Sequence, residues 1–161
     1  MKISALVGIL MLAASSYAGA QVDQLYGTWR LLSWVRQSVD AGERLDTFGK
    51  APSGYLSLGR DGRMLVLIVR ENRPKPTDLT KMTDQERADL FKSMIAYGGT
   101  FKLEGSRFVT DVDISWNENW TGTKQPRNFK IEGDRLILSA DPAPGVDGKR
   151  VSAVLTWQKV Q

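Results

Sequence analysis

The connections between the strand-like segments of this chain alternate strictly between short and long. Eight segments are rich in β-branched, aromatic and aliphatic residues and end in Gly, Pro, Asp or Asn, which is typical of β-strands. These segments are 26–36, 53–58, 63–70, 98–103, 107–116, 125–132, 135–140 and 150–160. Tight glycine-containing turns occupy 59–62, 104–106 and 133–134, and the long connections are 37–52, 71–97, 117–124 and 141–149.

This alternation constrains the fold. Successive connections of an up-and-down antiparallel sheet fall at opposite ends, so all the long loops gather at one end and all the tight turns at the other. The sequence therefore predicts an all-β fold, an eight-stranded up-and-down antiparallel β-barrel with a closed base and one elaborated, open mouth. An interior of this size is filled by side chains or holds one small ligand.

One helix is expected at the mouth, within the longest connection. Thr83 and Glu86 have the spacing of a capping box, in which each side chain satisfies a free backbone donor of the other. Leu90, Phe91, Met94 and Ile95 recur at helical spacing before Gly98-Gly99. We expect this apolar stripe to pack on the core.

The first residues have the pattern of a leader. Lys2 precedes a short apolar run, and Ala18-Gly19-Ala20 matches a signal-peptidase site. The sequence predicts a signal peptide over 1–20, a mature barrel domain over 21–161, and a periplasmic or secreted protein with no membrane association after cleavage. An uncleaved anchor is the alternative. The chain has no cysteine, so its core alone must stabilise the domain.

Charge and composition argue against several function classes. The net charge is +4, but opposite signs are interleaved along the chain, which does not fit a nucleic-acid partner. With no His and no Cys, a histidine-based catalytic triad is excluded, only an oxygen-ligand metal is conceivable, and no calcium-loop spacing is present. Asp111 and Asp113 are expected in solvent, because Val112 and Ile114 occupy the alternate, inward positions. We predict no metal and no cofactor.

Arg127 is the main candidate for a ligand contact. It shares one strand face with Phe129 and Ile131, whereas the opposite face carries Lys130 and Glu132. Parity therefore places the Arg127 guanidinium inside the barrel near the mouth. It either anchors an anionic group of a ligand or forms a structural ion pair with an internal carboxylate.

Several aromatic residues are expected to converge on the same opening. Tyr97, Trp116, Trp120 and Tyr55, together with Gln125, are the further candidate ligand-binding residues. They suit a small, largely apolar ligand, aromatic or anionic. The alternative is a small cofactor-independent isomerase, cyclase or lyase, in which Arg127 stabilises an oxyanion and Tyr97 or Glu118 moves a proton.

The chain also resembles a known family. Gly27-Thr28-Trp29 looks like the Gly-x-Trp signature of lipocalins, and most of the mature domain resembles the bacterial and fungal lipocalin-like domain family. The matching segments are 27–31, 53–56, 61–64, 96–99, 120–127, 133–136 and 155–157. The resemblance implies a calycin-type barrel in which Trp29 plugs the base and Lys159 packs across it.

The resemblance implies no single activity, since related barrels include both binders and small isomerases or cyclases. Relatives often carry a histidine near Thr110, and this chain has none, which puts any histidine chemistry in doubt here. Leu32 and Trp34 differ in parity from Trp29. They are therefore expected on the outer wall, which suggests a structural or assembly module with a partner packed there. The N-terminal segment or the helix is the alternative cover.

Overall fold

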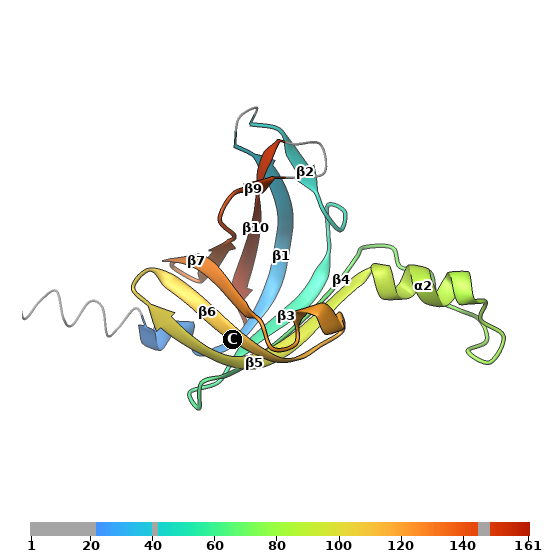
Figure 1. Ribbon diagram of the computed structural model, residues 1–161, viewed down its shortest axis with the longest axis horizontal. Helices are drawn as coiled ribbons and strands as arrows, with labels where there is room; N and C mark the ends of the chain where they lie inside the picture. The colour runs from blue at the N-terminus through green and yellow to red at the C-terminus, as the bar shows by residue number, and fades with distance from the viewer. Residues whose placement is uncertain (1–21, 40–41, 145–148) are drawn as a thin grey trace, which may run out of the picture.

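The computed structural model describes residues 22–39, 42–144 and 149–161, and these form a closed antiparallel β-barrel (Figure 1). The barrel strands are β1 (Gly27–Ser38), β3 (Ser53–Leu58), β4 (Arg63–Val69), β5 (Met94–Glu104), β6 (Arg107–Ser115), β7 (Lys124–Glu132), β8 (Arg135–Ser139) and β10 (Arg150–Lys159). The minor elements are β2 (Arg44–Asp46), β9 (Ala143–Pro144), the helix α2 (Asp84–Lys92) and the 3-10 turn η1 (Glu118–Trp120). The predicted signal peptide, residues 1–20, lies outside the described residues.

Each barrel strand pairs with the next one along the chain, and β1 closes the sheet against β10. Trp29 pairs with Leu56 of β3 and with Lys159 of β10, so the start of β1 lies beside the ends of both neighbours. The three tight turns therefore share this end of the barrel, and the long connections lie at the other. The eight-stranded barrel predicted from the sequence is confirmed.

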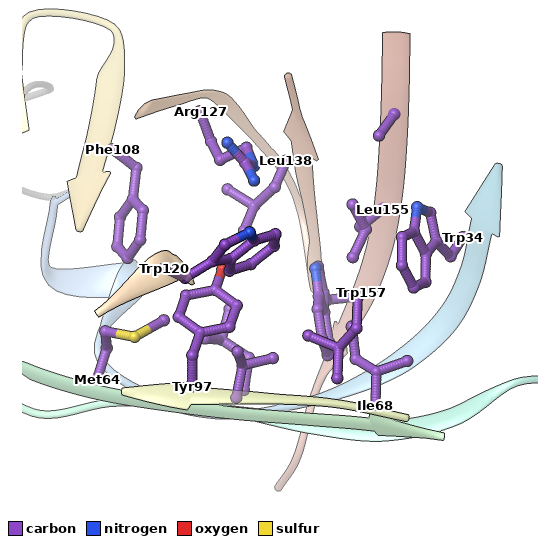
Figure 2. A pocket seen from close by; sticks show the side chains of 14 residues that line it. Trp34, Met64, Ile68, Tyr97, Phe108, Trp120, Arg127, Leu138, Leu155 and Trp157 are labelled. Atoms are coloured by element: carbon purple, nitrogen blue, oxygen red, sulfur yellow. The ribbon is translucent and has the colours of Figure 1, made fainter. Parts of the chain in front are cut away.

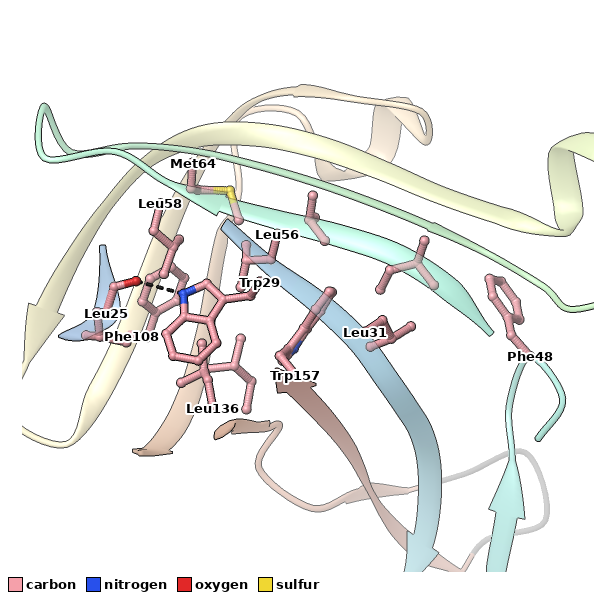
Figure 3. Packing of buried hydrophobic residues seen from close by; sticks show 13 residues of the cluster. Leu25, Trp29, Leu31, Phe48, Leu56, Leu58, Met64, Phe108, Leu136 and Trp157 are labelled. Atoms are coloured by element: carbon pink, nitrogen blue, oxygen red, sulfur yellow. Dashed lines mark hydrogen bonds between the residues drawn. The ribbon is translucent and has the colours of Figure 1, made fainter. Parts of the chain in front are cut away.

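The base of the barrel is closed by Trp29, which is only 1% exposed. Figure 3 shows its indole Nε1–H donating to the Leu25 carbonyl at 2.8 Å. The Lys159 ammonium lies 4.4 Å from the centre of the Trp29 ring and donates to the carbonyls of Gln24 and Tyr26. Burial lowers the pKa of Lys159, and the nearby positive charge of Arg60 lowers it further. The expected Trp29–Lys159 arrangement is thus present.

The buried core continues from this plug toward the mouth as one apolar cluster (Figure 3). It consists of the residues that face inward at alternate positions, including Leu31, Leu56, Leu58, Val66, Ile68, Phe108, Leu136, Leu138 and Trp157. A core of this kind needs no disulfide to hold the two sides of the barrel together.

The helix differs from the expectation. The capping box is present, with Thr83 and Glu86 bonded reciprocally, but α2 ends at Lys92 and buries no residue. Phe91 is 52% exposed, and Figure 1 shows α2 projecting away from the barrel. Ile95 lies in β5, opposite Ile68 of β4, because barrel pairing satisfies its backbone and packs its half-buried side chain against the core. The prediction of a longer helix packed on the core was wrong.

Two β-bulges reverse the parity of the residues beyond them. In β1 the register with β10 shifts between Leu31 and Ser33, so Leu32 is the extra residue and Trp34 turns inward. The outer-wall prediction for Trp34 was therefore wrong. Its ring packs edge-on against Phe48, with ring centres 4.7 Å apart.

The second bulge lies where β5 faces β6. Gly98 pairs with Ile114 but Gly99 pairs with Val112, which leaves Asp113 as the extra residue. Ile114 is consequently 64% exposed, and its predicted inward position was wrong. A Cβ atom at Gly99 would lie 1.9 Å from the Asp111 carbonyl oxygen, so the close approach of the two strands requires glycine there.

Because α2 buries none of its residues, its stability should be separable from that of the barrel. We expect Thr83→Ala to destabilise α2 by about 1 kcal/mol through loss of the cap, while the barrel unfolds at an unchanged denaturant midpoint. Amide hydrogen exchange should show faster exchange confined to α2, and Thr83→Ser should behave as wild type. An equal loss of global stability would mean that the helix is part of the cooperative fold.

Candidate ligand-binding site

A cavity lies inside the barrel above the Trp29 plug. It contains about 570 Å³ of space free of protein atoms, including its opening to solvent, and its wall is mostly apolar. The lining residues are Trp34, Leu56, Met64, Val66, Ile68, Ile95, Tyr97, Phe108, Trp120, Arg127, Leu138, Ala153, Leu155 and Trp157.

Aromatic rings form one side of the cavity. Tyr97 of β5 and Trp120 of η1 meet edge to face with ring centres 5.3 Å apart (Figure 2). Trp116 packs edge-on behind Trp120 at 5.0 Å. Trp116 therefore supports the wall without lining it. The Trp120 carbonyl accepts a hydrogen bond from the Thr123 hydroxyl at 2.7 Å, which holds the turn in place.

Arg127 reaches the cavity from β7, and strand parity explains why. Phe129 and Ile131, its neighbours on the same face, pack against the core. The guanidinium donates to the Pro126 carbonyl at 2.7 Å and to Gln125 Oε1 at 3.3 Å. Gln125 in turn donates to the Thr123 hydroxyl at 3.2 Å, so it positions Arg127 from the side.

Arg127 has no ion-pair partner among the described residues. Asp141, the carboxylate whose pKa it helps to lower, is bonded to Arg107 and Asn128 instead. Both acceptors that Arg127 does use are neutral. The structural ion pair considered from the sequence is thus not observed, and the guanidinium keeps donor capacity for a further acceptor.

The Tyr97 phenol keeps its proton. Although part of this side chain borders the open cavity, desolvation inside the barrel raises the pKa of Tyr97, and the positive charge of Arg127 offsets that only in part. At neutral pH the hydroxyl is therefore a hydrogen-bond donor and a poor general base.

This pKa shift predicts a pH dependence of stability. An unfolded tyrosine loses its proton near pH 10, whereas Tyr97 in the barrel still holds it there. Above this pH, folding is therefore coupled to the uptake of a proton. The stabilisation that the buried Tyr97 phenol contributes is complete below about pH 10, and it is lost as the pH rises through the pKa of Tyr97 in the folded protein. We expect urea unfolding midpoints to fall more steeply above this pH in wild type than in Tyr97→Phe. Parallel curves would contradict the shift.

Two further tryptophans line the cavity that were not predicted there from the sequence, Trp34 and Trp157. The indole N–H groups of Trp34 and Trp157 are buried and have no hydrogen-bond acceptor among the described residues. Trp157 could have been found from parity, because it alternates inward with Leu155 and Lys159. Trp34 could not, because the bulge at Leu32 reverses its side.

Some predicted residues lie elsewhere. Tyr55 is 56% exposed on the outer wall, since Gly54 and Leu56 on either side of it are buried, so its predicted place in the site was wrong. Glu118 is exposed and bonded to the Thr121 hydroxyl at 3.2 Å. Asp111 and Asp113 form outer ion pairs with Lys124 and Arg63. Over the described ranges, no three acidic residues gather into a possible metal site.

The fold and this cavity agree with the comparison to known families. Residues 26–160 match the family described as the lipocalin-like domain. The chain belongs to this lipocalin-like family. One relative, the 4'-hydroxy-3'-methoxypropiophenone carrier protein of Aspergillus oryzae, is 35% identical over 86 residues, which span 48% of this chain and 78% of the relative.

A solved structure of an uncharacterized protein from Bacteroides eggerthii is also similar, with a TM-score of 0.40 and 11% sequence identity. The match covers 83% of this lipocalin-like chain and 98% of the other. In the described part of the chain, no helix has the length and hydropathy needed to cross a bilayer.

Proposed function

We propose that this lipocalin-like protein carries one small aromatic molecule inside its barrel, and that the molecule bears hydrogen-bond acceptors. The observation that supports this most is the chemistry of the cavity wall. Its polar side chains can all donate hydrogen bonds: Arg127, Tyr97 and the tryptophans Trp34, Trp120 and Trp157, and no carboxylate lines it among the described residues.

The apolar part of the wall favours a flat, single-ring ligand. Burying apolar surface contributes about 25 cal/mol per Å², and the Tyr97 and Trp120 rings add edge-to-face contacts. A ring placed between this aromatic side and the aliphatic side chains of Leu138 and Leu155 would contact protein on both faces.

The acceptor requirement comes from Arg127. A guanidinium facing an apolar cavity gains most from an anionic or strongly polarised oxygen, and charge-assisted hydrogen bonds contribute about 1.5–3 kcal/mol. The relative from Aspergillus oryzae is named as a carrier of a propiophenone with a hydroxyl and a methoxy group. A phenolic aryl ketone has this combination of one ring and several acceptors, so we propose that class for this chain.

Carrying is favoured over catalysis by the same residues. A small isomerase or lyase in this cavity would need a group to move a proton near neutral pH. With its pKa raised, Tyr97 can donate a proton but offers no base, and Glu118, the other candidate, lies outside on an exposed turn.

We further propose that the carrier works outside the cytoplasm, in the periplasm or the medium. The support is the leader pattern of residues 1–20, with its charged start, apolar run and Ala18-Gly19-Ala20 site. Intact mass of the protein recovered from an exporting host should correspond to a chain that begins at Gln21. A full-length mass in the membrane fraction would contradict export with cleavage.

Titration with 4'-hydroxypropiophenone tests the binding proposal. Because Trp34, Trp120 and Trp157 line the cavity, saturable quenching of tryptophan fluorescence at one ligand per chain is expected. Propylbenzene, which keeps the ring and the chain but has no oxygen, should bind more weakly. Failure of the ketone to bind, or equal binding of both compounds, would overturn the proposal.

A further inference from the structure

Two tryptophan N–H groups inside the barrel have no acceptor of their own among the described residues. Trp157 is 1% exposed, and the Nε1 atoms of Trp157 and Trp34 are both buried. Buried donors in folded proteins are nearly always paired, so each unpaired one requires an explanation. Trp29 shows the usual case, since its Nε1–H donates to the Leu25 carbonyl at 2.8 Å.

The two tryptophans with unpaired N–H groups lie on the same side of the cavity. Trp34 belongs to β1 and pairs with Leu155 of β10, and Trp157 follows Leu155 by two residues, so the two rings enter the barrel from adjacent strands. Figure 2 shows Trp34, Leu155 and Trp157 on one side, with Arg127, Trp120 and Tyr97 across the cavity from them.

We propose that Trp34 and Trp157 form a second polar subsite, which binds a neutral carbonyl oxygen at the end of the ligand remote from Arg127. This inference rests on the proposed function and adds the ligand's second anchor. Indole N–H groups carry no net charge, so they suit a ketone or ester oxygen, whereas the guanidinium suits a phenolate or carboxylate. The cavity thus selects rings that carry one acceptor at each end.

The bulge at Leu32 gives this subsite its structural origin. Without the extra residue, Trp34 would face outward with the alternate residues of β1, and only Trp157 would remain inside. One insertion in the first strand therefore supplies half of the proposed subsite. Bulges of this kind often redirect a side chain toward a functional site.

Indole NMR tests the subsite directly in the wild-type protein. The chain has 5 tryptophans, and ¹⁵N-tryptophan labelling gives each a separate Nε1–H resonance, assigned through single Trp→Phe variants. Saturation with 4'-hydroxypropiophenone should move the Trp34 and Trp157 protons downfield. The Trp29 proton, already bonded to Leu25, should stay in place and serves as the internal control.

Affinity measurements test the same point with matched probes. Trp34→Phe and Trp157→Phe remove the N–H and keep an aromatic ring. Each should weaken the binding of 4'-hydroxypropiophenone by roughly three- to tenfold, which is the loss expected when one neutral hydrogen bond is removed. The probe 4-propylphenol keeps the phenol and lacks the carbonyl. Its affinity should fall in each variant only by the small amount that comes from replacing an indole ring with a smaller phenyl ring.

The outcomes separate the two proposals. If both probes bind and each variant weakens both equally, with no downfield shift in wild type, the indoles only pack and the subsite is refuted while the carrier function stands. If neither probe binds the wild-type protein, both proposals fall. If Trp157→Phe does not fold, the wild-type NMR shift still decides.

Discussion

Replacing Arg127 by methionine is expected to weaken the binding of 4'-hydroxypropiophenone by roughly 10- to 100-fold, while the free energy of unfolding changes by less than about 1 kcal/mol. Affinity falls because the variant removes a charged donor from an apolar cavity. Stability is kept because methionine fills a similar volume and no buried carboxylate loses its partner.

Fluorescence titration and urea unfolding of the same variant measure both quantities. Arg135→Met is the matched control, because Arg135 lies exposed on β8 and carries the same charge. It should leave both affinity and stability unchanged. A loss of about 3 kcal/mol in stability with full affinity would show instead that Arg127 is a structural residue.

Replacing Trp29 by alanine should have the largest effect on stability, a loss of about 3–5 kcal/mol in the free energy of unfolding. The ring is 1% exposed at the base of the core. Its removal leaves a void, strands the Leu25 carbonyl and takes away the surface on which the Lys159 ammonium lies.

Lys159→Met separates the parts of this effect. It removes the charge above the Trp29 ring and keeps the plug, so a loss of about 1 kcal/mol is expected in urea unfolding. If Trp29→Ala cost no more than Lys159→Met, the base would be held by its turns, and the plug role of Trp29 would be wrong.

Much of the fold could be predicted from local rules. Turn chemistry and parity placed the eight strands and their closure, and β3 begins at Ser53 and ends at Leu58 as predicted. Parity fails wherever a bulge adds a residue, because one insertion exchanges the inner and outer faces of everything beyond it. Trp34 and Ile114 were misplaced for this reason. The end of α2 was misplaced because strand pairing of Ile95 outweighs its helical spacing.

The site was only partly predictable. The structure brings Arg127, Tyr97 and Trp120 to one cavity, since all three positions follow from regular alternation or from the turn after β6. Tyr55 was misplaced because its neighbours Gly54 and Leu56 take the inner face. The unpaired indole donors depend on which ring nitrogens find acceptors, and only three-dimensional packing determines that.

A crystal structure of the protein grown with 4'-hydroxypropiophenone tests the central proposal most directly. We expect the ring inside the barrel between Tyr97 and Leu155, with the phenol oxygen within hydrogen-bond distance of the Arg127 guanidinium and the ketone oxygen toward Trp157. A ligand bound only on the outer wall, or a cavity closed by its own side chains at saturating ligand, would contradict it.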